Sequence, residues 1–177
     1  VILPVAEEIM QRTDTAYYGL DSDTMAEVVG RLLMARSHTL SGADSCTGGG
    51  LGQLLTATPG SSAYFWGGII SYDNRVKQGL LGVSESALAQ CGAVSPEVAA
   101  AMAEGVRDRI GTDWGISITG IAGPGGGSVE KPVGLVYVGL SSAQGTTTEK
   151  FEFGTSLIRQ RIRQRSALSA LNGLRIA

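Results

Sequence analysis

Residues 38–57, HTLSGADSCTGGGLGQLLTA, combine a strand, a glycine-rich turn and a helix in direct succession. Polar and apolar side chains alternate over residues 38–43, which is typical of a strand. The SCTGGG segment at 45–50 can turn tightly because glycine tolerates many backbone conformations. The LGQLLTA segment at 51–57 has the apolar spacing of a helix. A strand that passes into a helix in this way indicates an α/β protein.

The alternation of strands and helices continues on both sides of this segment. We expect further strands at 65–72, 113–119, 133–140 and 146–153, and helices at 4–12, 22–37, 73–81, 84–90, 95–110 and 156–174. The helix at 95–110 has the clearest signals, with Ser95 as N-cap, Pro96 at the first helical position and Gly111 after its last turn. At the start of the helix at 22–37, we expect Ser22 to be the N-cap.

The order of these elements predicts a three-layer α/β/α sandwich with a mixed, mostly parallel sheet of about five strands. A length of 177 residues fits one such domain. The connection between the last two strands, SSAQG at 141–145, is too short for a parallel crossover. We therefore expect that pair to be antiparallel.

The composition excludes several classes of protein. Hydrophobic residues make up 43% of the chain and charged residues 17%, which favours a packed core over disorder. The net charge of −2 argues against a broadly basic nucleic-acid-binding protein, and no apolar run reaches the ~18 residues of a membrane span. With only two cysteines, Cys46 and Cys91, we expect a reducing, cytoplasmic setting. Because His38 is the single histidine, we expect no catalytic metal, and we expect no cofactor.

The SCTGGG segment is the first candidate for a functional site, because unpaired backbone N–H groups at a helix start attract negative charge. Ser45 is the candidate nucleophile, and the N–H groups near Thr47, Gly48 and Gly49 could bind an oxyanion or a phosphate. The alternative is a capped helix start with a tight turn. Cys46 fits better as a small buried residue than as a nucleophile, since His38 should lie well below the turn.

The SYDNRVK segment at 71–77 brings Tyr72, Asn74 and Lys77 within one turn of the next helix. Ligands of open α/β sheets bind at this edge, beyond the carboxyl ends of the strands. Lys77 or Tyr72 could then move protons for a Ser45 nucleophile, provided that burial or a nearby cation such as Arg75 keeps the lysine neutral. The alternative is a solvated helix start.

Two further segments are candidates for binding or for solvent exposure. The glycine-rich loop GIAGPGGGSVEKP at 120–132 follows a strand and is long enough to be functional, and Lys131 could bring positive charge to a bound anion. The RQRIRQR segment at 159–165 places Arg159 and Arg163 on one helix face and Arg161 and Arg165 on another. We interpret most of these arginines as a solvated face.

The chain resembles the C-terminal domain of the competence/damage-inducible CinA family, over about residues 25–170. The resemblance is carried by several motifs in a fixed order, namely SCTGG at 45–49, LT at 55–56, PGSS at 59–62, GGIISYDNRVK at 67–77, LGV at 81–83, GAVS at 92–95 and TGIAGPGGG, EKPVG and VYVG within 114–139. Two positions depart from the family pattern: Asp44 replaces the usual glutamate, and the family's closing glycine–aspartate–arginine motif is stretched, so that only Ile162 and Arg163 fall in register.

The resemblance implies a nicotinamide-nucleotide amidase, which deamidates nicotinamide mononucleotide to nicotinic acid mononucleotide and ammonia, within a three-layer α/β/α fold. It implies that residues 22–177 form the amidase domain and that residues 1–21 are a linker remnant or an N-terminal helix. It also implies substrate-binding roles for a set of residues, namely Thr47, Gly48, Gly49, Asn74, Thr119, Gly120, Gly123, Lys131 and Arg163.

The resemblance also bears on partners. Residues 17–30 are similar to the linker that precedes this module in longer CinA proteins, where the partner domain has a molybdopterin-binding-like fold with pyrophosphatase activity. We expect a pyridine nucleotide as ligand, a homo-oligomer, no membrane and no specific nucleic acid. The alternative function is a non-catalytic nucleotide-binding or competence-related interaction module.

Overall fold

The computed structural model describes residues 5, 8, 10, 12–13, 16–20 and 22–177 of the chain. The helix expected at 4–12 and most of the segment at 1–21 therefore lie outside the continuously described residues. The elements are α2 (Met25–Ala35), β1 (Leu40–Asp44), α3 (Gly50–Thr56), the short 3₁₀ helix η2 (Ser61–Ala63), β2 (Phe65–Ile70), α4 (Asn74–Leu81), α5 (Glu85–Cys91), α6 (Pro96–Ile110), β3 (Trp114–Gly120), β4 (Leu135–Ser142), β5 (Gly145–Glu152) and α7 (Arg159–Ile176).

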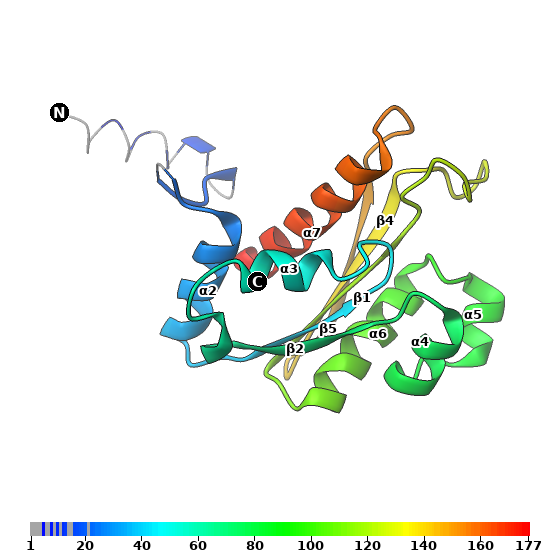
Figure 1. Ribbon diagram of the computed structural model, residues 1–177, viewed down its shortest axis with the longest axis horizontal. Helices are drawn as coiled ribbons and strands as arrows, with labels where there is room; N and C mark the ends of the chain where they lie inside the picture. The colour runs from blue at the N-terminus through cyan, green and yellow to red at the C-terminus, as the bar shows by residue number, and fades with distance from the viewer. Residues whose placement is uncertain (1–4, 6–7, 9, 11, 14–15, 21) are drawn as a thin grey trace.

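The five strands form one mixed sheet in the order β2-β1-β3-β4-β5 (Figure 1). β1 pairs in parallel with both β2 and β3, whereas β4 is antiparallel to β3 and to β5. The expected antiparallel pair is confirmed, and its connection is shorter than the five residues predicted, because β4 and β5 extend until only Ala143 and Gln144 separate them. Parallel pairing is thus confined to the β2-β1-β3 end of the sheet.

Helices cover both faces of the sheet, which confirms the three-layer fold (Figure 1). α2, α3 and α7 pack together over one face, above a core that includes Leu40, Leu51 and Ile118. α4, α5 and α6 cover the other face, where Ala43, Met102 and Val106 are buried. No helix among the described residues is long and apolar enough to cross a membrane.

Helix α6 lies very close to strand β4, and the sequence explains why it can. A Cβ atom at Gly139 would come within 2.4 Å of the Ala99 carbonyl oxygen in α6. Real Cβ atoms do not approach a backbone oxygen so closely, so glycine at this position sets the distance between the helix and the sheet. The predicted caps of α6, Ser95 and Gly111, are both confirmed.

The start of α2 differs from the sequence prediction. The N-cap is Thr24, not Ser22: the Thr24 side chain accepts from the Glu27 N–H, and the Glu27 carboxylate accepts from the Thr24 N–H. This reciprocal pair is a capping box, which satisfies two backbone donors at once, whereas a serine two residues earlier cannot reach them. Similarly, α7 begins at Arg159 rather than near Ser156.

Candidate active site

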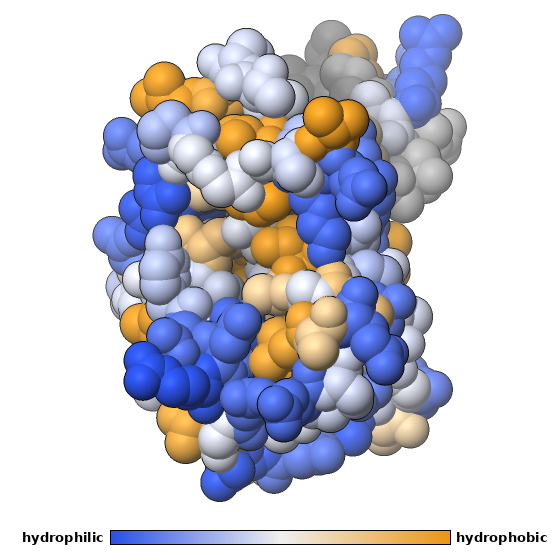
Figure 2. Space-filling view, turned by 90° about the vertical axis from the view of Figure 1, so that its right-hand side faces the viewer, coloured by the Kyte–Doolittle hydropathy of each residue, from blue (hydrophilic) through white to orange (hydrophobic). Residues whose placement is uncertain are grey.

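The candidate site lies beyond the carboxyl ends of the three parallel strands, where the chain leaves β1, β2 and β3. Figure 2 shows this side of the molecule as a hollowed surface with apolar residues at its centre and hydrophilic residues around it. A cavity of about 190 Å³ opens here. It is lined by Ser45, Cys46, Tyr72, Asn74, Lys77, Ala93, Val94, Thr119, Gly120, Ala122 and Arg159.

Ser45 and Lys77 are in direct contact at the bottom of this site. Lys77 Nζ donates to Ser45 Oγ over 3.2 Å, and it also donates to the Ser71 carbonyl over 2.6 Å. A longer contact of 3.4 Å reaches the Tyr72 carbonyl. Because α4 starts directly after β2, a residue in its first turn can reach back to the end of the neighbouring strand β1. Only 1% of Lys77 is exposed, so the solvated alternative does not apply to it.

Burial also changes the acidity of the lysine. The pKa of Lys77 lies below its usual value, because removal from water disfavours the ammonium form, and the negative charge of Asp73 partly opposes this shift. Arg75 does not supply the effect that the sequence suggested for it. Its guanidinium binds the Asp73 carboxylate at 3.0 Å and helps to lower the pKa of Asp73 to about 2. Of the two causes considered from the sequence, burial is the one that acts.

The turn after Ser45 presents fewer free N–H groups than the sequence indicated. Gly48 and Gly49 adopt positive φ angles of 59° and 94°, which glycine accepts without strain. The Gly48 N–H donates to the Ser45 carbonyl, and the Gly49 N–H donates to the Asp44 carboxylate. The N–H groups of Cys46 and Thr47, in contrast, donate to no other residue in the described part of the chain. Of these two residues only Cys46 lines the cavity, so its N–H, and not those of Gly48 and Gly49, is placed to meet an oxyanion.

Cys46 and His38 do not form a catalytic pair. Cys46 is buried, and burial together with the nearby Asp44 carboxylate raises the pKa of its thiol to about 12. The thiolate needed for nucleophilic attack is therefore scarce at neutral pH. His38 lies at the opposite end of β1 and accepts a hydrogen bond from the Trp114 indole through Nδ1.

Tyr72 and Arg159 frame the mouth of the cavity. Tyr72 is 62% exposed, and its hydroxyl is 3.1 Å from an Arg159 nitrogen. Arg159 also donates to the Gly123 carbonyl over 2.8 Å, so its guanidinium bridges the segments that follow β2 and β3. The sequence interpretation assigned most of the arginines at 159–165 to a solvated face. Arg159 is exposed, but it also lines the cavity, and the sequence analysis missed it as a site residue. Its one signal was its position on the same helix face as Arg163.

The remaining predicted residues are spread around the cavity. Arg163 donates to the Thr47 carbonyl, while its buried Nε has no partner among the described residues. The Thr119 hydroxyl donates to the Ala93 carbonyl in the cavity wall. Gly120 packs against β4, where a Cβ atom would come within 2.7 Å of Val136. Asn74 lines the cavity at the first position of α4.

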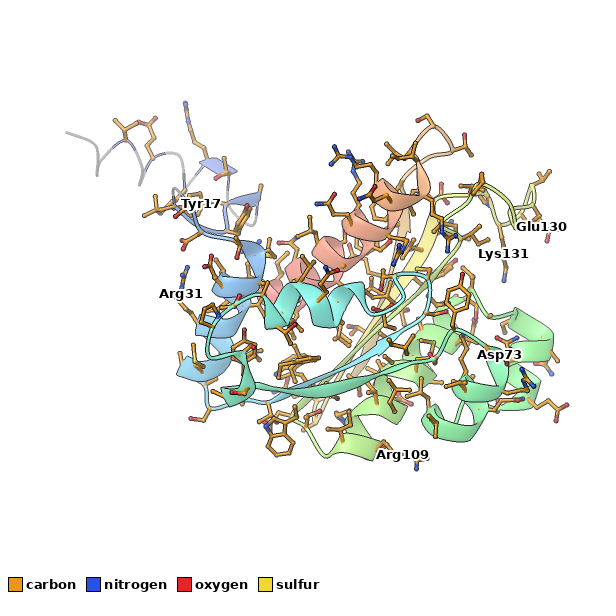
Figure 3. All side chains as sticks on the ribbon, in the orientation of Figure 1. Tyr17, Arg31, Asp73, Arg109, Glu130 and Lys131 are labelled. Carbon is orange, nitrogen blue, oxygen red and sulfur yellow. The ribbon has the colours of Figure 1, made fainter. Side chains whose placement is uncertain are left out.

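Lys131 lies farther from the cavity than the sequence suggested. Its ammonium donates to the carbonyl groups of Cys91 and Val94, so it ties the 120–132 loop to the connection between α5 and α6. Figure 3 shows the labelled Lys131 extending from this loop toward α5. In this arrangement the amine supports a cavity wall and does not line the cavity.

No group of three His, Cys, Asp or Glu side chains among the described residues could hold a metal ion. What the site offers chemically is a serine hydroxyl, a buried amine, free backbone N–H groups and two guanidinium groups. This set can attack a carbonyl carbon, transfer a proton and bind an anion.

Comparison with known proteins places the chain in a family. A model of the CinA C-terminal domain matches residues 22–177. CinA-like proteins of Cyanothece sp. (strain PCC 7425 / ATCC 29141) and of Synechocystis sp. (strain ATCC 27184 / PCC 6803 / Kazusa) are 58% and 56% identical, over 98% and 99% of this chain. The chain spans 42% of the length of each of these relatives.

Solved structures are similar as well. The competence/damage inducible protein CihA from Agrobacterium tumefaciens is 35% identical, with a TM-score of 0.80 over 88% of this chain and 97% of that one. A CinA superfamily protein from Escherichia coli is 28% identical, with a TM-score of 0.81 over 93% of this chain and 98% of that one. The resemblance stated from the sequence motifs is thus confirmed, and the chain belongs to the CinA family, whose C-terminal domain it matches over residues 22–177.

Proposed function

We propose that this domain is an amidohydrolase that converts nicotinamide mononucleotide to nicotinic acid mononucleotide and ammonia. The observation that carries the proposal is the contact between Lys77 Nζ and Ser45 Oγ at 3.2 Å. Lys77 is buried, so its amine is shielded from water. A buried amine next to a serine hydroxyl is a pairing that activates a nucleophile without a histidine. The substrate follows from the family resemblance.

The contacts of Lys77 suit a neutral amine acting as a base. Two of its hydrogens can remain on the carbonyl groups of Ser71 and Tyr72, which leaves the lone pair directed at the Ser45 hydroxyl. Ser45 Oγ attacks the carboxamide carbon as Lys77 takes the serine proton. The carbonyl oxygen gains the negative charge, for which the N–H group of Cys46, a residue that lines the cavity, is the available donor.

In the remaining steps Lys77 first acts as an acid and then again as a base. Lys77 returns its proton to the leaving nitrogen, the carbon–nitrogen bond breaks, and ammonia leaves an ester on Ser45. Water then attacks the ester carbon while Lys77 accepts a water proton, and that proton passes to Ser45 Oγ as the acid is released. Tyr72 is less suited to this task, because its exposed hydroxyl contacts Arg159.

The size of the cavity suggests how the nucleotide lies. About 190 Å³ is below the ~300–1,000 Å³ of typical ligand pockets, so the carboxamide-bearing ring would enter and the ribose phosphate would lie over the mouth. Arg159 lines the cavity and Arg163 follows it one turn later in α7, and no carboxylate of the described residues forms an ion pair with either one. We assign the phosphate to these two guanidinium groups, which suit its oxygens.

The main alternative is a module that binds a pyridine nucleotide without turning it over. Ammonia release and nucleotide binding, measured on the same preparation with nicotinamide mononucleotide, separate the two. The proposed function predicts stoichiometric ammonia and nicotinic acid mononucleotide. Saturable binding by calorimetry with no ammonia would instead establish the binding module.

A further inference from the structure

We infer that Asp44 is a positioning residue for the reaction, whose carboxylate fixes the turn that carries Ser45 and the oxyanion donor Cys46. This inference rests on the proposed function. Asp44 is the last residue of β1 and precedes Ser45 directly. Asp44 is not among the described residues that line the cavity, and its side chain hydrogen-bonds Thr47, Gly49 and Leu51, so its effect on catalysis would act through other residues.

The carboxylate of Asp44 accepts three hydrogen bonds, two from the turn and one from the first turn of α3. Oδ1 accepts from the Thr47 hydroxyl, while Oδ2 accepts from the N–H groups of Gly49 at 3.0 Å and Leu51 at 3.2 Å. Only 4% of Asp44 is exposed, and no lysine, arginine or histidine of the described residues forms an ion pair with it. A buried carboxylate is costly without such partners, so these donors and the positive end of α3 hold it there.

This arrangement determines which backbone N–H groups of the turn remain without a partner among the described residues. At the start of α3, the N–H groups of Gly49 and Leu51 bind the protein's own carboxylate, so these two are not available to a substrate anion. Thr47 is held at its hydroxyl by Asp44 and at its carbonyl by Arg163. The N–H group of Cys46, which lines the cavity, is left to receive the oxyanion, at a position set by these contacts.

The charge of Asp44 has the opposite effect to its hydrogen bonds. Its negative charge contributes to the raised pKa of the Cys46 thiol, so its field reaches the residue next to Ser45. By charge alone, Asp44 opposes an oxyanion at this place, and its removal would speed the reaction. By geometry, removal releases Thr47, Gly49 and Leu51 and would slow the reaction. Asp44→Asn removes the charge and keeps the shape of the side chain, so it shows which of the two effects is larger. We expect the loss of the hydrogen bonds to be the larger effect, so that the reaction slows.

The experiment compares Asp44→Asn and Asp44→Glu with a matched control, Asp113→Asn. Asp113 makes the same kind of contacts, accepting from the Thr39 N–H and hydroxyl at 2.7 Å, but at the opposite end of the sheet. For each variant, kcat and KM for ammonia release from nicotinamide mononucleotide are measured together with the melting temperature. Thr47→Val, which removes one donor to Asp44 and keeps the side-chain shape, serves if Asp44→Asn does not fold.

We expect Asp44→Asn to lower kcat by about 10- to 100-fold with less than about a threefold change in KM, since small displacements of reacting groups cost rates of this order. Asp44→Glu, which keeps the carboxylate, should recover most of that loss. Thr47→Val should lower kcat in the same direction, and Asp113→Asn should lose thermal stability while kcat stays at the wild-type value.

Several results would overturn the inference. These are a wild-type or higher kcat for Asp44→Asn or Thr47→Val, an effect on KM alone, an Asp44→Glu variant as slow as Asp44→Asn, or an equal loss of kcat in Asp113→Asn. If the wild-type protein itself releases no ammonia, the proposed function fails, and this inference fails with it. If instead the wild-type protein releases ammonia and substitution of Asp44 leaves kcat unchanged, only this inference fails and the proposed function stands.

Discussion

Lys77 is a buried lysine whose amine hydrogen-bonds a serine hydroxyl and two backbone carbonyl groups. Its pKa is lowered chiefly by burial, so the neutral form becomes populated below the usual lysine value of about 10.4. Only the neutral amine accepts a proton. We therefore expect kcat for ammonia release to rise with pH through the lowered pKa of Lys77. A profile that falls over this range would contradict a base role.

Substitution of Lys77 separates its charge from its basicity. Lys77→Met removes both and should lower kcat by about 10²-fold or more, the usual scale for acid–base catalysis. Lys77→Arg keeps a positive charge but stays protonated, so it should be as slow as Lys77→Met. Steady-state kinetics with nicotinamide mononucleotide give the comparison. Restoration of kcat by arginine would transfer the base role to Tyr72.

Substitution of Arg159 tests whether this residue binds the phosphate of the substrate. Arg159→Ala should raise KM for nicotinamide mononucleotide by about 10- to 100-fold, because hydrogen bonds to charged groups contribute about 1.5–3 kcal/mol. Arg161 is a matched control on the next helix face, where its guanidinium contacts only Gln164 among the described side chains. Arg161→Ala should leave KM unchanged, and equal effects of the two substitutions would argue against a specific phosphate contact.

Single residues differ in how well the sequence could predict them. Ser45 and Lys77 stand in segments whose positions at strand ends could be recognised from periodicity and glycine content. Arg159 could not be distinguished from its exposed neighbours, because its contacts to Tyr72 and Gly123 depend on how α7 packs. The hydrogen bonds from the Gly49 and Leu51 N–H groups to Asp44 could not be predicted from the sequence either, since a carboxylate before a turn has several possible partners.

Helix α2 provides the test at the level of elements. Thr24 caps this helix, and Thr24→Ala should lower the free energy of unfolding by about 1 kcal/mol, the typical loss for an N-cap. Ser22→Ala, at the position wrongly predicted as the cap, should have little effect. Urea denaturation of the two variants measures both values. A larger loss for Ser22→Ala would contradict the capping box.

The elements themselves were largely predictable, because apolar periodicity and capping residues are local signals. The limits of α6 follow from Ser95, Pro96 and Gly111, and all three act as expected. The sequence predicts the start of α7 three residues too early, because the N-cap residue, Ile158, has no side chain that can form a capping hydrogen bond. Where a capping side chain is absent, the end of a helix can be predicted from the sequence only to within about one turn.

In the whole molecule, the mixed sheet brings together residues that are distant in sequence. Ser45 and Lys77 are 32 positions apart, and Arg159 meets Tyr72 across 87 positions. Parallel pairing of β1 with β2 and β3 places the ends of all three strands at one edge. The sequence predicted that edge as the site, but the distances and the burial of Lys77 required the structure.

The central claim is that Ser45 attacks the carboxamide with Lys77 as its base. The most direct test is the rate of ammonia release from nicotinamide mononucleotide by folded Ser45→Ala, compared with the wild-type protein. Loss of the nucleophile should lower kcat by about 10³-fold or more, since catalytic groups that act as a unit fail together. Near-normal ammonia release by a properly folded Ser45→Ala protein would contradict the account and indicate direct attack by water.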